Sequence, residues 1–294
     1  MTSPGVRIVP IDEVDGLLRT ASALSYVLDG GRVDGLQAQV RGADARAQCR
    51  WSYEDTEYWR QRELGPLIVR TDGPSALAER FIRDWSPLSA GIVSDASAPF
   101  ETTQAHWREL RHAILPDGRL ALFRSHDPAH LRALMEGMSA AEVDQLLGPA
   151  KWWMWRELHA GRDTWYRVEQ GGAWQPSAIT QAWRITPQQM ESLDRHAFAA
   201  YVDTATPRLR EVVPLLRELE IGQAREKVVL MSQAGRRLGF VQADDLDGYL
   251  ELVFLHNARC MTPGDVHQTL TDTDRPAWQR LEHARALLQS ELPA

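Results

Sequence analysis

Two histidines four residues apart, His126 and His130, have the spacing in this sequence that most suggests metal chemistry. Histidines at positions i and i+4 of one helix can share a metal ion. Here Pro128 suits the first position of a helix and Asp127 suits the capping position before it. His126 then lies outside the helix and does not face His130 across a turn. Local spacing supplies no third ligand, so we expect no metal site here.

The other reactive side chains do not form a known catalytic pattern. The sequence contains no Gly-x-Ser-x-Gly elbow and no glycine-rich phosphate-binding motif. Cys49 and Cys260 have no motif around them and are expected to be buried thiols. Asp244, Asp245 and Asp247 lie in the first turn of an expected helix, where the helix dipole alone accounts for acidic residues. We therefore expect no catalytic residue and no cofactor. An enzyme of unknown class stays open, because acidic residues distant in the sequence can meet in space.

A tryptophan-rich segment offers a different chemistry, that of contact surfaces. Residues 151–158 and 164–170 are predicted to be two strands of a hairpin that turns at 159–163. Aromatic residues fall on both faces, so the hairpin is either covered on both sides or exposes an adhesive face. Core packing, a protein-docking surface and a carbohydrate-stacking platform are the alternatives, since tryptophan, tyrosine and arginine dominate protein interfaces. The candidate partner-binding residues are Trp153, Trp155, Trp165, Tyr166 and, outside the hairpin, Arg124.

Composition narrows the classes of function. The 294 residues suggest two domains, and 44% apolar with 25% charged residues is typical of globular proteins. The net charge is -7, and neither part of the chain is basic: residues 1–185 carry 21 basic and 24 acidic residues, and the rest carry 12 and 16. Bulk attraction to nucleic acids or anionic membranes is therefore not expected. Two cysteines, no apolar leader and no bilayer-length apolar run predict a cytoplasmic protein.

The elements that would position these residues form an α+β fold. Residues 1–185 are predicted to be an α/β domain and residues 186–294 an all-helical lobe. The first part has predicted strands at 24–28, 66–70, 91–94, 113–115 and 120–124, and predicted helices through 77–85, over 103–113 and after Asp127. Ser139 and Glu142 form a capping box for the next helix, which Gly148 and Pro149 end.

Helix-start signals mark the second part of the chain. Thr186, Pro187 and Gln189 have the types expected of a helix N-terminus. Thr206 and Pro207 repeat the signal and predict the start of a second helix, which Pro214 should kink or divide. Further helices are expected at 223–238, 244–258, 262–270 and 275–292.

Residues from about 24 to 150 resemble a family of type VI secretion adaptors, also called Tap or TEC proteins, that contain a domain of unknown function. The resemblance is most specific from Leu110 to Pro149, and residues 26–30, with Asp29, and 65–69 match earlier family motifs. The matching pairs and triplets are Leu110-Arg111, Asp117-Gly118-Arg119, Phe123-Arg124, Asp127-Pro128 and Gly148-Pro149. The family usually has an aromatic residue where His126 stands and an arginine where Ala129 stands.

The resemblance implies a non-enzymatic adaptor and chaperone. Such adaptors bind the N-terminal part of an effector toxin and the C-terminal part of a VgrG spike protein, and so load the effector onto the spike. The resemblance implies no catalytic residues, and it gives the matched positions a structural role. A carbohydrate-binding module that uses the tryptophan hairpin and an enzyme are the alternatives to this adaptor.

Overall fold

The computed structural model describes residues 6–159, 162–172, 174 and 182–290. The chain divides into two compact units, Met1–His196 and Ala197–Ala294, which we describe separately. Strands and helices mix in the first unit, whereas the described part of the second contains helices, so the predicted α+β class is confirmed. No helix within the described ranges is long and apolar enough to cross a membrane.

The first unit is built on a seven-stranded antiparallel sheet. The strands predicted at 24–28, 66–70 and 91–94 are confirmed as β2, β4 and β5, with β2 central between the other two. The predicted hairpin is confirmed as β8 and β9, and it extends the sheet beyond β5. In spatial order the strands are β1 (Arg7–Val9), β9 (Arg162–Glu169), β8 (Trp152–His159), β5 (Gly91–Asp95), β2 (Ala23–Asp29), β4 (Pro66–Asp72) and β3 (Gln48–Trp51).

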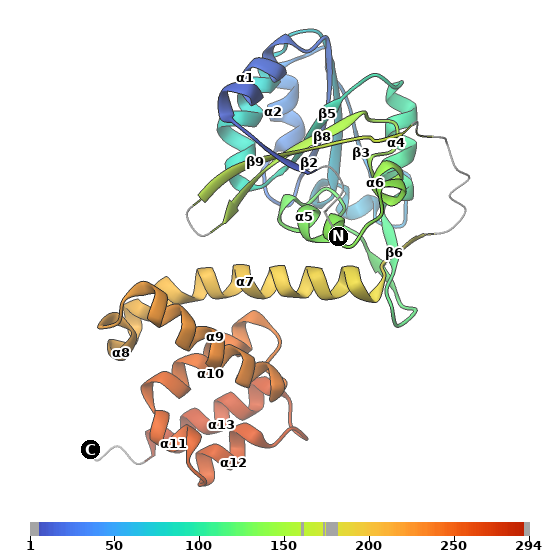
Figure 1. Ribbon diagram of the computed structural model, residues 1–294. Coiled ribbons are helices and arrows are strands. Elements are labelled where there is room, and N and C mark those ends of the chain that lie inside the picture. The colour runs from blue at the N-terminus through green and yellow to red at the C-terminus, as the bar shows by residue number, and fades with distance from the viewer. Residues whose placement is uncertain (1–5, 160–161, 173, 175–181, 291–294) are drawn as a thin grey trace. The chain divides into compact units, whose positions relative to one another are not determined.

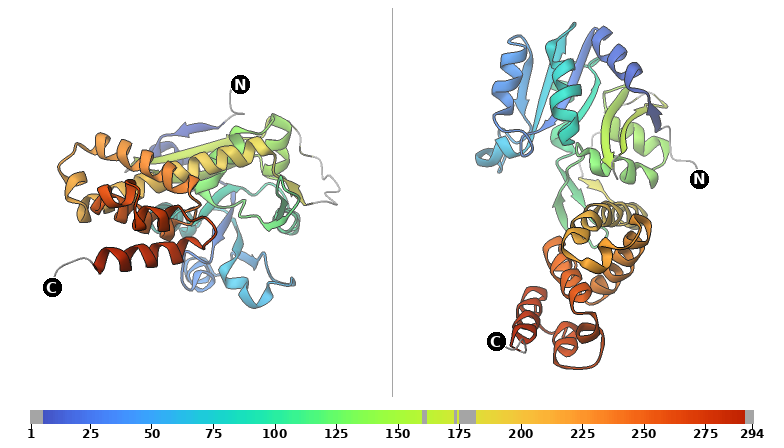
Figure 2. Two further views of the ribbon diagram at one scale, coloured as in Figure 1. Left: turned by 90° about the horizontal axis from the view of Figure 1, so that it is seen from below. Right: turned by 90° about the vertical axis from the view of Figure 1, so that its left-hand side faces the viewer.

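Helices cover both faces of this sheet (Figures 1 and 2). Successive strand residues point to opposite faces, so Tyr26 packs in one apolar cluster and Val27 in another. The first cluster lies beneath α1 (Ile11–Thr20), α2 (Leu36–Ala43), α3 (Ala76–Arg80) and the short π-helix η2 (Phe81–Trp85). The second lies beneath α4 (Phe100–Glu109), α5 (Pro128–Glu136) and α6 (Ala140–Leu147). Two 3-10 helices, η1 (Trp59–Leu64) and η3 (Ser86–Leu88), complete the connections.

A smaller sheet joins three short strands, β6 (His112–Ile114), β7 (Leu120–Leu122) and β10 (Trp183–Arg184). The predicted turn between β6 and β7 is confirmed, with Gly118 at a φ of +86° that favours glycine. The helix expected over 103–113 is corrected at its end: α4 stops at Glu109 because His112 begins the ladder with β7. Strand β10 pairs in parallel with β6 and so forms the other edge of this sheet.

The helix caps lie where the sequence predicts them. The Asp127 side chain accepts a hydrogen bond from the Ala129 amide at the start of α5, and Pro128 takes the first helical position. Ser139 and Glu142 form the complete capping box of α6. Such a cap contributes about 1 kcal/mol to stability. These caps fix the segment on which the candidate site depends.

The second unit packs helices around one apolar core, and α7 (Pro187–Val212) runs into it from the first unit. The predicted start of α7 is confirmed by reciprocal hydrogen bonds between Thr186 and Gln189. The predicted helix start at Thr206 is wrong, because α7 continues through Pro207. Burial of side chains before and after it, such as Val202 and Leu209, offsets the cost of a helical proline.

The later helices follow the expected order. Pro214 divides the helix, as predicted, and opens the next one. Gly239, at a φ of +85°, follows the helix expected to end there. The helices are α8 (Pro214–Arg217), α9 (Ile221–Arg237), α10 (Ala243–Leu255), α11 (Asn257–Met261), α12 (Asp265–Thr271) and α13 (Ala277–Gln289).

Candidate functional site

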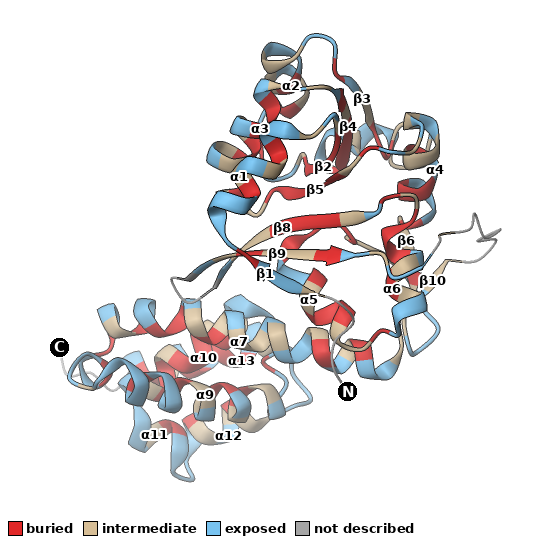
Figure 3. Cartoon of the chain, turned by 45° about the horizontal axis from the view of Figure 1, so that its top comes forward, coloured by how far each residue is buried: buried red, intermediate tan, exposed pale blue. Residues whose placement is uncertain are grey.

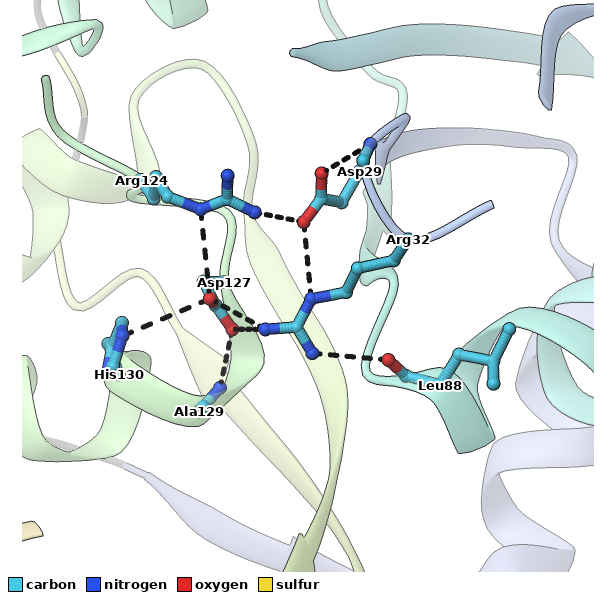
Figure 4. A network of polar contacts seen from close by, with 8 residues as sticks. Asp29, Arg32, Leu88, Arg124, Asp127, Ala129 and His130 are labelled. Carbon is cyan, nitrogen blue, oxygen red and sulfur yellow. Dashed lines mark hydrogen bonds and ion pairs between the residues drawn. The ribbon is translucent and has the colours of Figure 1, made fainter. Parts of the chain in front are cut away.

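Three of the motif residues meet in one polar network (Figure 4). Asp29 ends β2, Arg124 follows β7, and Asp127 caps α5. Arg32, from the loop that leads to α2, lies between the two carboxylates. The network thus joins two segments that are 95 residues apart in sequence. We call Asp29, Arg32, Arg124 and Asp127 the Asp–Arg cluster.

Both oxygens of Asp29 are engaged. Oδ1 accepts a hydrogen bond of 3.0 Å from the Gly31 amide, which closes the turn after β2. Oδ2 accepts from Nη2 of Arg124 and forms an ion pair with Nε of Arg32 at 3.3 Å. Because the Asp29 side chain is only 1% exposed, these donors replace the water that the carboxylate loses on folding.

Asp127 is held in the same way. Nη2 of Arg32 donates to its Oδ1 at 3.1 Å and its Oδ2 at 2.9 Å, while the Ala129 amide also donates to Oδ1. Nη1 of Arg32 donates to the Leu88 carbonyl at 3.2 Å, so the guanidinium ties three segments together. Charge-assisted bonds of this kind are stronger than neutral ones.

The balance of charge and exposure defines what the Asp–Arg cluster can do. Two carboxylates face two guanidinium groups, and every carboxylate oxygen accepts a hydrogen bond, so the charges balance within the cluster. The arginine side chains are 33% and 40% exposed. Arg124 therefore keeps part of its guanidinium at the surface. The cluster is therefore suited to hold its segments together rigidly without net charge. It also leaves the Arg124 guanidinium where a partner can contact it.

The two histidines that suggested metal chemistry lie beside this cluster. His126 is buried, and this desolvation lowers the pKa of its imidazole to about 4. His130 is half exposed, with Nε2 3.9 Å from Oδ2 of Asp127. Across the described residues, no group of three or more histidine, cysteine, aspartate or glutamate side chains is arranged to hold a metal.

The remaining motif residues shape the backbone. Gly148 has a φ of +62°, and a Cβ there would lie 2.4 Å from the imidazole of His106, which packs under the turn. Nε2 of His106 bonds the Leu146 carbonyl at 2.9 Å. Asp117 and Gly118 form the exposed β6–β7 turn, where the Asp117 carboxylate accepts from the Arg119 amide. Pro149 follows the glycine at the end of α6.

The tryptophan hairpin is covered on both sides, which corrects the expectation of a docking surface for three of its rings. Trp153 and Trp155 are buried in the cluster under α4–α6, and Trp165 is buried in the cluster on the opposite face. Figure 3 shows buried residues along both β8 and β9. The Trp153 ring stacks on Trp107 with centroids 5.0 Å apart. These rings are not available as a carbohydrate platform either.

Tyr166 keeps part of its surface accessible, but its ring is already engaged. It stacks on Trp155 with centroids 5.8 Å apart, and the guanidinium of Arg132 lies 5.6 Å from its centroid. Of the five candidate partner-binding residues, Arg124 and Tyr166 therefore remain accessible.

Sequence reasoning missed Arg32. It lies three residues after Asp29, in a turn whose course the sequence does not reveal. The signal that could have found it is charge: a motif with buried Asp29 and Asp127 needs more than the single cation of Arg124.

Comparison with known proteins supports the sequence resemblance over the same stretch. Residues 24–145 match the family model described as Domain of unknown function (DUF4123). The match runs from β2 into α6 and contains the whole Asp–Arg cluster. Neither the curated proteins nor the solved structures contain a match to the chain. We call residues 24–145 the DUF4123 region.

Removal of the Asp29 carboxylate is expected to destabilise the first unit. Asp29→Ala should lower the free energy of unfolding by about 2–3 kcal/mol, because Gly31, Arg32 and Arg124 lose an acceptor while the exposed sides of the arginines can partly rehydrate. Asp117→Ala, in the exposed turn, is the matched control and should change it by less than about 0.5 kcal/mol. Urea unfolding followed by tryptophan fluorescence measures both. Equal effects of the two substitutions would contradict a structural role for the cluster.

Proposed function

We propose that this protein is a non-enzymatic adaptor and chaperone of type VI secretion. It binds an effector toxin through the effector's N-terminal region and loads it onto the C-terminal region of a VgrG spike. The observation that carries the proposal is the DUF4123 match, because this domain is associated with type VI secretion effector adaptors. We place this activity in the cytoplasm, before the secretion apparatus fires.

The architecture of the DUF4123 region fits this role. An adaptor must hold its partners' surfaces in a fixed geometry, and the Asp–Arg cluster fixes the loops at one end of the sheet. Several large apolar side chains remain exposed near these loops along the chain. They are Trp59, Leu64, Leu88, Leu120 and Leu122. Exposed apolar groups next to arginine are the usual ingredients of a protein interface.

Two partners require two surfaces. A stable interface buries on the order of 1,600 Å² in total. The chain offers two compact units, each with its own apolar core, and each can carry one interface. We propose that the DUF4123 region and the helical unit divide the partners between them.

Co-purification tests this proposal directly. The tagged chain is produced with the effector and the VgrG spike encoded beside it, and with a spike from an unrelated cluster as the control. We expect both cognate partners to be retained at micromolar concentration, the control spike to be lost, and the effector to be poorly soluble without the adaptor. Retention of neither cognate partner would contradict the proposal.

A further inference from the structure

The helical unit contains a hollow between its helices that its own side chains do not fill. Leu215 of α8, Leu230 and Met231 of α9, and Met261 of α11 contribute to its wall. Val253, Phe254, Asn257 and Lys227 complete the lining. We call these eight residues the helical groove. Its hollow of about 130 Å³ approaches the ~150 Å³ cavity that takes up a benzene ring, so it can accept one large apolar side chain.

The rim of the groove is apolar and open to solvent. Leu215, Leu230 and Met261 are 48%, 56% and 46% exposed, although each is a large apolar residue. Such exposed residues gathered around one hollow indicate a binding surface, whereas single ones do not. Methionine side chains adapt their shape to different partners, and Met231 and Met261 line the groove from two different helices.

Lys227 is the one charged residue in the lining. Its side chain is exposed, and within the described residues it has neither an ion pair nor a hydrogen bond. It is one of only two lysines in a chain with 31 arginines. An unpaired ammonium beside an apolar hollow favours an occupant that brings a carboxylate to it.

The backbone of the occupant is constrained as well. The described part of the second unit is helical and offers no sheet edge with which an extended segment could pair. An α-helix satisfies its own amides and carbonyls, so it can lie in the groove without a strand to pair with. Amphipathic helices dock in apolar grooves through anchors spaced i, i+3, i+4 and i+7.

We infer that the helical groove binds an amphipathic, acidic α-helix of a protein partner, with one large apolar anchor in the hollow and a carboxylate at Lys227. This inference rests on the proposed function in naming the effector as the protein that carries the helix. Burial of that apolar face would also explain why an effector needs a chaperone, since the bound form is stabilised by mass action.

Substitutions in the full-length chain test the inference. Leu230→Asp should weaken effector binding at least tenfold, and Lys227→Glu should weaken it about fivefold. Lys151→Glu, which changes the only other lysine, and Val241→Asp, an exposed apolar residue outside the groove, should have no effect. Isothermal titration measures affinity. Thermal unfolding should show all four variants folded, since each replaces an exposed side chain.

A displayed library of amphipathic helical peptides tests the groove without the effector. The wild-type chain should enrich peptides with a carboxylate beside the apolar face, Lys227→Glu should enrich peptides with a lysine there, and Leu230→Asp should enrich neither. Light scattering over a dilution series checks for a second copy as the occupant, and a concentration-dependent mass that Leu230→Asp abolishes would overturn the inference.

The two proposals fail separately. If the wild type retains the effector and Leu230→Asp retains it equally well, the groove inference is wrong and the adaptor function stands. If the wild type retains no cognate partner, the adaptor function fails. Groove-dependent, charge-reversible peptide enrichment then still supports the helix-binding site, and its absence overturns that site too.

Discussion

Replacement of Trp153 by alanine is expected to lower the free energy of unfolding of the first unit by about 3–5 kcal/mol, the usual cost of removing a large buried aromatic side chain. Trp153 is 1% exposed and stacks on Trp107 within the apolar cluster beneath α4–α6. A cavity of this size should collapse only in part, because the sheet on one side and the helices on the other are held by their own neighbours. The expected loss is a large fraction of the stability of an ordinary domain.

Trp59 is the matched control for this prediction. Trp59 lies in η1 and is 53% exposed, so Trp59→Ala should change the free energy of unfolding by less than about 0.5 kcal/mol. Urea unfolding can be followed by tryptophan fluorescence, because ten of the 11 tryptophans lie in Met1–His196. If Trp153→Ala does not fold, Trp153→Phe should fold with a smaller loss. Full stability of Trp153→Ala, with loss of a partner, would restore the docking role that burial argues against.

Local signals in the sequence predicted much of the fold. Caps such as Ser139 with Glu142 and Thr186 with Gln189 depend on residues three apart, so their chemistry is visible in the sequence. Central strands such as β2 are also visible, because they are short apolar runs that end at a turn. Pro207 shows the limit: a start signal is local, whereas the core that keeps α7 continuous is formed by distant helices.

The candidate site was predictable only in part, for a related reason. The family motif indicated Asp29, Arg124 and Asp127, but their convergence depends on how the segment between β7 and α5 packs against the end of β2, and local sequence signals do not predict that packing. Arg32 belongs to no motif, and its role appears only once both carboxylates are buried beside it. The tryptophan hairpin was open to both interpretations because its aromatics fall on both faces. Because helices cover both faces of β8 and β9, the buried tryptophans of the hairpin serve core packing.

Acidification is expected to destabilise the first unit between pH 6.5 and pH 4. Burial lowers the pKa of His106 and of His126 from 6.5 to about 4, so both imidazoles stay neutral in the folded chain. The unfolded chain takes up these protons below pH 6.5, and the folded chain does so only near pH 4. The contribution of the two histidines to stability is therefore complete above pH 6.5, falls as the pH drops and is lost below about pH 4, and it amounts to roughly 3 kcal/mol from each histidine.

His126→Phe separates the two contributions and tests the sign. The adaptor family that the sequence resembles usually has an aromatic residue at this position, and Nε2 of His126 has no hydrogen-bond partner among the described residues, so the substitution leaves no partner of that atom unsatisfied. We expect stability at pH 7 within about 1 kcal/mol of the wild type, since the ring is replaced by one of similar size. The loss of stability between pH 7 and pH 4.5 should fall by about half.

His256→Gln, at an exposed position of the helical unit, is the control and should leave that loss of stability unchanged. A variant at position 126 that is as sensitive to acid as the wild type would show that His126 takes up its proton in the folded chain. The buried end of β2 would then have to accommodate a third cation beside Arg32 and Arg124, which two carboxylates with every oxygen already engaged are poorly placed to balance.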